Sequence, residues 1–125
     1  MKVLLSIKPE YAEKILGGVK LFEFRKAVFR KPSVKTVVLY ATKPVGKVIG
    51  EFDIEEIFAE APSTLWSMTF KFAGIPSGLF DQYFRGRQKA YAIKVRQVRR
   101  YDVPLNLHAV LDRGVPPRSF CYLNL

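Results

Sequence analysis

The stretch from Gly17 to Lys26 constrains the fold more than any other part of the sequence, because a helix signal and a strand signal meet there. Its two opening glycines favour the end of a helix, since one of them is expected to need a positive φ. Phe22 and Phe24 then share one face of an extended segment, and Glu23 and Arg25 share the other. A strand used only for packing has little need of ionisable groups. The pattern therefore predicts a strand that also contributes to a polar site.

Length and composition indicate one globular domain, residues 1–125, with a real hydrophobic core. Hydrophobic residues make up 49% of the chain, which excludes a disordered protein. No apolar run is long enough to span a bilayer, so we expect no membrane partner. A single cysteine, Cys121, allows no internal disulfide. Together these features predict a cytoplasmic protein.

The net charge favours a polyanionic partner. Lys and Arg number 21 against 11 Asp and Glu, which gives +10. Such an excess most often serves contact with nucleic acid, although some basic proteins carry it only for solubility. Charge alone therefore favours contact with nucleic acid or a nucleotide and leaves the fold open.

Hydrophobic periodicity predicts an α+β protein with three helices and about six strands. We expect helices over residues 10–16, 62–72 and 76–85, strands over residues 3–7, 20–26, 35–42, 47–58 and 88–100, and a short apolar strand at the end of the tail 116–123. Val103-Pro104 is expected to end the fifth strand. The strands follow one another without regular βαβ alternation, so a mostly antiparallel sheet is favoured. Closure into a small barrel would remove its exposed edges.

Several of these segments resemble the ASCH domain family, which belongs to the PUA-like superfamily of β-barrels. The resemblance rests on Ser6-Ile7-Lys8-Pro9, the short helix, and Gly18-x-Lys20-x-x-Glu23-x-Arg25, which matches the family signature at every fixed position. Ala90-Tyr91-Ala92-Ile93 and Tyr101-x-x-Pro104 are similar to its closing strand. The resemblance covers nearly the whole chain.

The resemblance implies a PUA-like barrel with a cleft beside the first helix, lined by the signature. It also implies binding of RNA or of modified nucleotides. Some members are hydrolases: one branch deacylates N4-acylated cytidine, and another has been proposed to cut RNA. The first branch carries Thr three residues after the signature lysine, where this chain has Glu23. Its nucleophile is therefore missing here, and its activity is not expected.

The signature side chains have the chemistry of a nucleotide site. Arg25 can hold a phosphate through two hydrogen bonds, and Lys20 can supply a point charge. Glu23 can accept hydrogen bonds from a base, or act as a general base while Lys20 stabilises developing charge in a hydrolase. Lys20 and Glu23 have opposite strand parity, so Lys20 must precede the strand or a bulge must intervene. The plainer alternative is that Glu23 and Arg25 simply pair with each other.

Further nucleic-acid contacts are predicted at three other places. Lys8 lies where a helix N-terminus can meet an anion, or is a solvated loop lysine. Tyr40 and Thr42 can contact a base, or pack inside the barrel. A basic tract with interleaved tyrosines has the composition of a surface that follows a nucleic-acid backbone, or of a solvated face; its cations include Arg85, Arg87, Lys89, Lys94 and Arg96.

Other chemistries find little support in the sequence. We expect no metal site and no cofactor, because His108 is the only histidine and phosphate-binding or dinucleotide glycine motifs are absent. A blander alternative is a protein-interaction domain that exposes Trp66, Phe70 and Phe72. The sequence leaves three points open: the ligand, the oligomeric state, and the role of the acidic strand residues Glu51, Asp53 and Glu55.

Overall fold

A computed structural model of the chain describes residues 1–124. In these residues six strands form one sheet, in the order β2-β5-β4-β3-β1-β6. The strands are β1 (Lys2–Ile7), β2 (Phe22–Arg25), β3 (Thr36–Ala41), β4 (Lys47–Glu60), β5 (Ala90–Leu105) and β6 (Phe120–Leu123). β1 and β3 run parallel, and every other neighbouring pair is antiparallel.

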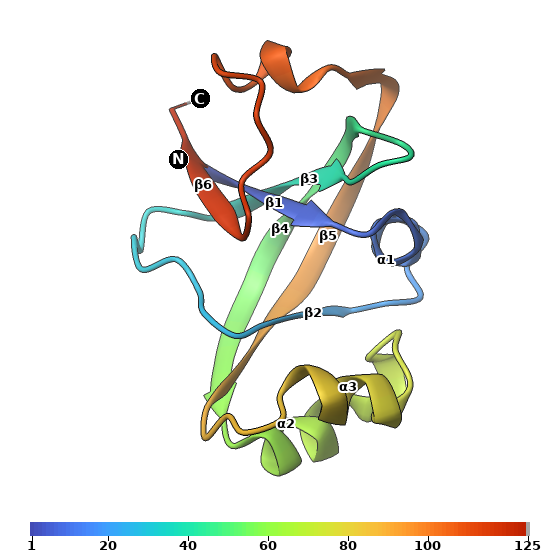
Figure 1. Ribbon diagram of the computed structural model, residues 1–125, viewed down its shortest axis with the longest axis vertical. Helices are drawn as coiled ribbons and strands as arrows, with labels where there is room; N and C mark the ends of the chain where they lie inside the picture. Colours follow the sequence, from blue (N-terminus) through green and yellow to red (C-terminus); the bar gives the residue numbers. More distant parts are fainter. Residues whose placement is uncertain (125) are drawn as a thin grey trace.

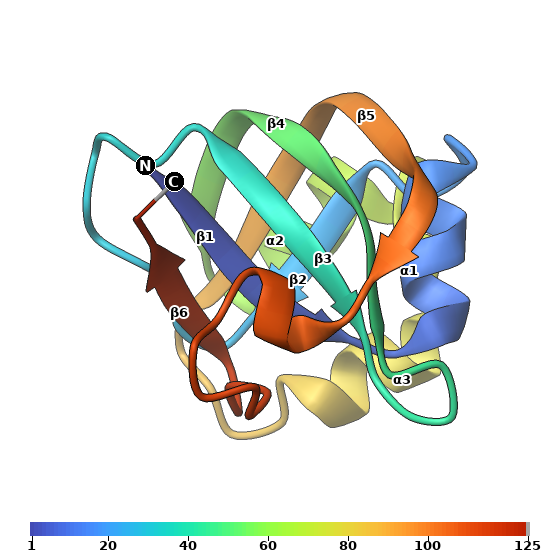
Figure 2. The same ribbon diagram turned by 90° about the horizontal axis from the view of Figure 1, so that it is seen from above.

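The sheet curls into a half-barrel (Figure 2). β4 and β5 form its long ribbon, and register shifts at three points of their ladder, one beside Gly50, bend them. β2 and β6 are the two edges, and among the described residues no ladder joins them. The predicted α+β fold, with about six mostly antiparallel strands in a PUA-like barrel, is thus confirmed as an open, curled form.

Three helices cover the open parts of this sheet within residues 1–124. α1 (Pro9–Leu16) follows β1, and α2 (Pro62–Thr69) and α3 (Ser77–Tyr83) lie together at one end of the molecule (Figure 1). Two 3-10 turns complete the structure, η1 (Phe70–Phe72) and η2 (Leu107–Ala109). α1 ends in the predicted way, because Gly18 takes the positive φ of +81°.

Both faces of the sheet are buried over part of their area. Val3, Leu5 and Ile7 of β1 point into the half-barrel, as the alternation predicts. Phe22 and Phe24 pack against Phe80 and Phe84 beneath α2 and α3. On the outer face, the segment around η2 and β6 covers a third cluster that includes Leu4, Val38 and Tyr40. The sheet therefore holds α1 on one side of β2 and α3 on the other.

Two predicted boundaries are wrong. β5 does not stop at Val103-Pro104 but continues to Leu105. Pro104 is tolerated because it falls in a register shift between the pairs Gly50–Arg100 and Val48–Leu105, where β2 does not reach, so its missing N–H breaks no ladder bond. The helix predicted over 62–72 ends at Thr69 and tightens into η1.

Candidate functional site

A pocket of about 270 Å³ lies where β1, the approach to β2, and α3 meet. Lys20, Glu23 and Arg25, the three ionisable residues of the signature, all line it. The remaining lining residues come from the β1–α1 junction and from the α3 region: Ser6, Ile7, Lys8, Tyr11, Phe24, Ile75, Leu79 and Tyr83. The lining thus combines cations, one carboxylate and aromatic rings.

Lys20 is almost fully buried at the base of this pocket, with 1% of its surface exposed. Its Nζ donates a hydrogen bond of 2.6 Å to the carbonyl oxygen of Ala73. The same Nζ lies 4.7 Å from the ring centroid of Phe24 and 5.7 Å from that of Tyr11. Lys20 precedes β2, and this position resolves the parity conflict between Lys20 and Glu23.

Burial changes the acidity of this lysine. Desolvation lowers the pKa of Lys20 to about 8, although the negative charge of Glu23 opposes the shift. Lys14 adds a smaller effect in the lowering direction. Lys20 is therefore a group that both carries charge and exchanges a proton close to neutral pH.

Glu23 and Arg25 form an ion pair of 3.1 Å within the pocket lining, with 9% and 11% of their side chains exposed. Arg25 also donates to the Ser119 carbonyl oxygen at 2.8 Å, to Ser119 Oγ at 3.1 Å and to the Ser6 carbonyl oxygen at 3.5 Å. These bonds span the open seam between β2 and the segment that enters β6. Arg25 therefore helps to hold the fold together. Glu23 and Arg25 pair with each other and also line the pocket, so the two arrangements considered from the sequence occur together.

Ser119 is a further residue beside the pocket, and the sequence did not predict it. It precedes β6 and is held by Arg25 across 94 residues of sequence. No local pattern marks it, because its neighbourhood depends on how the sheet curls. Its hydroxyl is a polar group in direct contact with a pocket residue.

Tyr83 and Lys8 stand at the mouth of the pocket. Tyr83 ends α3 and is 38% exposed, and its ring lies 4.7 Å from Lys26 Nζ. Burial raises the pKa of its hydroxyl, and the charges of Arg25 and Arg87 oppose that rise. Lys8 is exposed at the start of α1.

Tyr40 and Thr42 do not line this pocket. Tyr40 is 5% exposed and belongs to the outer core cluster with Leu4 and Val48. Thr42 begins a turn, and its N–H donates to the Ile7 carbonyl oxygen. The predicted base contact is therefore not available to Tyr40, because its ring is already used in packing.

The basic tract divides into two parts. Lys94 pairs with Glu55 at 2.8 Å, and Arg96 lies 3.7 Å from Asp53. Their charges are thus partly balanced by β4, contrary to a free backbone-tracking surface. Between α3 and β5, by contrast, the exposed cations form no ion pair with any residue in 1–124: these are Arg85, Arg87 and Lys89.

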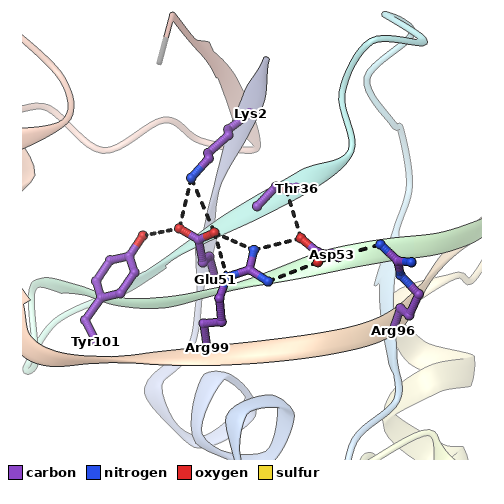
Figure 3. A network of polar contacts seen from close by, with 7 residues as sticks. All are labelled: Lys2, Thr36, Glu51, Asp53, Arg96, Arg99 and Tyr101. Atoms are coloured by element: carbon purple, nitrogen blue, oxygen red, sulfur yellow. Dashed lines mark hydrogen bonds and ion pairs between the residues drawn. The ribbon is translucent and has the colours of Figure 1, made fainter.

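Two acidic residues of β4, Glu51 and Asp53, form a separate network (Figure 3). Glu51 accepts hydrogen bonds from Lys2 at 3.1 Å, from Arg99 at 2.6 Å and from Tyr101 at 2.8 Å. Arg99 also bonds both oxygens of Asp53, at 2.7 and 3.0 Å. These groups line no part of the pocket, so the network is a structural tie between β4, β5 and β1.

The network shifts the acidity of its carboxyls. The Arg99 hydrogen bonds lower the pKa of Asp53 to about 2. Burial alone would raise the pKa of Glu51, but hydrogen bonds from Arg99, Tyr101 and Lys2 outweigh it and lower the value. Both carboxyls therefore stay ionised well into the acidic range.

Residues 1–124 contain neither a cluster of metal-ligating side chains nor a helix that could span a membrane. They contain no group of three or more His, Cys, Asp or Glu side chains placed to hold a metal ion. None of their helices combines the length and the apolar character needed to cross a membrane. His108 lies in η2 beside Gly114, and Cys121 is half-buried in β6.

The ASCH domain model matches residues 5–100 of this chain, a span that contains the whole pocket. An ASCH domain-containing ribonuclease of Zymomonas mobilis is 31% identical over 98% of this chain and 84% of its own length. The chain belongs to the ASCH domain family. The resemblance seen in the sequence is therefore confirmed.

Solved structures agree with this assignment. The crystal structure of ASCH from Zymomonas mobilis, at 31% identity, superposes with a TM-score of 0.90 and covers 98% of this chain and 87% of that one.

A second relative is the ATP synthase subunit alpha of Ureaplasma parvum, 31% identical over 97% of this chain. The match spans 15% of that protein's length.

Proposed function

We propose that residues 1–125 act as one ASCH domain that binds RNA, with one nucleotide in the pocket. The observation that carries the proposal is the convergence of Lys20, Glu23 and Arg25 in one pocket that also presents aromatic rings. Unstacked bases in RNA are held by aromatic faces and by hydrogen bonds to their edges. The net charge of +10 supplies the long-range attraction. The single cysteine supports a cytoplasmic location as part of this proposal.

Each polar group has a distinct task in this proposal. Lys8 is exposed at the mouth and contacts a phosphate. The Glu23 carboxylate accepts hydrogen bonds from a base or a ribose hydroxyl, and its ion pair with Arg25 fixes its position. Arg25 is a positioning residue, because most of its donors are directed to Glu23 and Ser119. Tyr11 and Tyr83 offer faces for stacking.

A titration with short RNA tests this proposal. Labelled single-stranded and duplex RNA would be titrated at 50 and 200 mM salt by fluorescence anisotropy, with Lys8→Ala compared with Lys35→Ala, an exposed lysine outside the pocket. We expect binding that weakens at the higher salt and a larger loss for Lys8→Ala. Absence of RNA affinity for the wild type at 50 mM salt would contradict the proposal.

A second candidate function is RNA cleavage, favoured by the Zymomonas ribonuclease, which is similar over nearly the whole chain. In this proposal Glu23 takes the proton of a ribose 2′-hydroxyl, which attacks the adjacent phosphorus. The P–O5′ bond breaks, a 2′,3′-cyclic phosphate forms, and the leaving 5′ oxygen gains a proton from the Lys20 ammonium. The pKa of about 8 suits Lys20 to that donation, and its charge stabilises the transition state.

Cleavage and binding can be separated with a near-isosteric variant. Glu23→Gln keeps an oxygen that can accept from Arg25 but removes the base. We expect RNA cleavage to fall by at least a hundredfold, with RNA affinity within a few-fold of the wild type. Cleavage at the wild-type rate by a folded Glu23→Gln protein would refute this role, while RNA binding would still stand.

A further inference from the structure

Beside the pocket mouth, three side chains from different elements form a cationic and aromatic cluster. Lys26 directly follows β2, Tyr83 ends α3, and Arg87 lies in the connection from α3 to β5. Lys26 Nζ stands 4.7 Å from the centroid of the Tyr83 ring. The Arg87 N–H donates to the carbonyl oxygen of Phe84 at 2.9 Å, so Arg87 lies in the turn directly after Tyr83, and its charge acts on the Tyr83 hydroxyl. We call Lys26, Tyr83 and Arg87 the rim cluster.

The rim cluster is continuous with the pocket but not part of its floor. Tyr83 lines the pocket, whereas Lys26 and Arg87 do not. Both cations are exposed, and neither forms an ion pair with a carboxylate of residues 1–124. The Tyr83 ring is held by an edge contact with Phe84 at 4.8 Å between centroids. The cluster is thus a fixed aromatic group flanked by two free positive charges.

The pocket alone is small for an RNA strand. Its volume of about 270 Å³ lies below the range of roughly 300–1,000 Å³ that is usual for drug-sized ligands. An RNA strand whose base enters the pocket must continue over the rim, and its next phosphate needs a cation there. Alternating cations and aromatic faces are the arrangement that binds successive nucleotides of single strands.

We propose that the rim cluster is a second subsite, which binds the phosphodiester and nucleotide next to the one in the pocket. This inference rests on the proposed RNA-binding function and narrows its ligand to single-stranded RNA of at least two nucleotides. Lys26 and Arg87 contact the phosphate, and Tyr83 separates the two nucleotides. A free nucleoside would leave these cations unused.

A matched pair of double variants tests the subsite. Lys26→Ala with Arg87→Ala removes the rim cations, and Lys35→Ala with Arg113→Ala removes one exposed Lys and one exposed Arg outside the pocket lining. Both proteins keep the same net charge. Each would be titrated with a mixed-sequence single-stranded RNA decamer over a salt series, and with the four ribonucleoside monophosphates, by calorimetry.

The expected result is a selective loss. The rim variant should bind the decamer at least tenfold more weakly than the control variant, and the magnitude of the slope of log K against log salt should fall by about 0.7, because one phosphate is no longer neutralised. Monophosphate affinities should agree within twofold.

Equal decamer affinities in the two variants would overturn the subsite and leave the RNA-binding function standing. An equal loss of monophosphate binding in the rim variant would also overturn it, because the cations would then belong to the pocket itself. A wild type that binds neither decamer nor monophosphate would remove both the subsite and the function on which it rests.

Discussion

Lys20 is the residue on which the chemistry of the pocket depends. It is the largest fully buried charged side chain of the described residues. Its ammonium donates a hydrogen bond to one carbonyl oxygen, lies near two aromatic rings and is attracted by the negative charge of Glu23. Burying such a cation is unfavourable unless it is paired or loses its proton. The site therefore holds a lysine whose charge is unusually easy to remove.

The lowered pKa of Lys20 predicts a pH dependence of stability. The unfolded chain binds the Lys20 proton up to about pH 10.5, whereas the folded chain releases it near pH 8. Between these values the unfolded state binds more protons, so the free energy of unfolding rises with pH. Relative to Lys20→Met, the wild type should gain on the order of 3 kcal/mol between pH 8 and 10.5.

Urea unfolding of both proteins at intervals from pH 7 to 10.5 measures this difference. The comparison with Lys20→Met cancels the titration of other groups. A difference that stays flat over this range would show that the Lys20 ammonium is solvated in the folded protein.

At the scale of elements, the turn between η1 and α3 is fitted to the approach to β2. Gly74 has a φ of +71°, and a Cβ on it would lie 2.5 Å from Lys20 Cγ. The neighbouring Ala73 carbonyl oxygen accepts the Lys20 hydrogen bond. Lys14 Nζ donates to the Gly74 carbonyl oxygen at 3.3 Å, and the Leu21 N–H donates to the Phe72 carbonyl oxygen at 2.9 Å, so several hydrogen bonds join this turn to the base of the pocket.

Substitution at this turn should be strongly unfavourable. Gly74→Ala is expected to lower the free energy of unfolding by about 2 kcal/mol or more, because it adds both a strained φ and a clash. Gly78→Ala in α3 is the control, since a Cβ there meets no atom within 4 Å, and it should be neutral or stabilising. Equal stabilities of the two variants in thermal unfolding would be inconsistent with the described packing.

The tie between β4 and β5 makes a second prediction at this scale. Arg99→Met leaves the buried Glu51 with Lys2 and Tyr101 only, and should destabilise the fold by about 2 kcal/mol at pH 7. The pKa of Asp53 is lowered from 3.8 to about 2, so the wild-type advantage over Arg99→Met is present above pH 4 and is lost as the pH falls toward 2. Denaturation curves at pH 7, 4 and 2.5 measure the advantage, and a constant difference would contradict this account.

For the molecule as a whole, the sequence predicted the fold class and the three signature residues that line the pocket. It predicted less well which residues surround the mouth of the pocket. The glycine exit of α1 and the alternation of Phe22, Glu23, Phe24 and Arg25 are local signals, and both hold in the structure. Local signals failed where distant segments decide the outcome. For Tyr40, at the end of a strand, the sequence left base contact and packing both open, and the segment around η2 covers its ring.

The pairing of the basic tract shows the same limit of local reasoning. Which cations of β5 are balanced depends on the register with β4, which brings Glu55 to Lys94 and Asp53 to Arg96. The contact of Ser119 with Arg25 could not be predicted from the sequence either, because only the curl of the sheet brings these two residues together. The charge of +10 therefore overstates the free positive surface.

An RNA strand with one nucleotide in the pocket formed by β1, α1, β2 and α3 must lie against the aromatic side chains that line it. Photo-crosslinking with single-stranded RNA that carries 4-thiouridine, followed by mass spectrometry of the peptides, tests it most directly. We expect crosslinks at the aromatic pocket residues Tyr11 and Tyr83. Efficient crosslinks found only at a separate cavity, whose lining includes Phe29, Arg30 and Ile57, would show that the strand binds elsewhere.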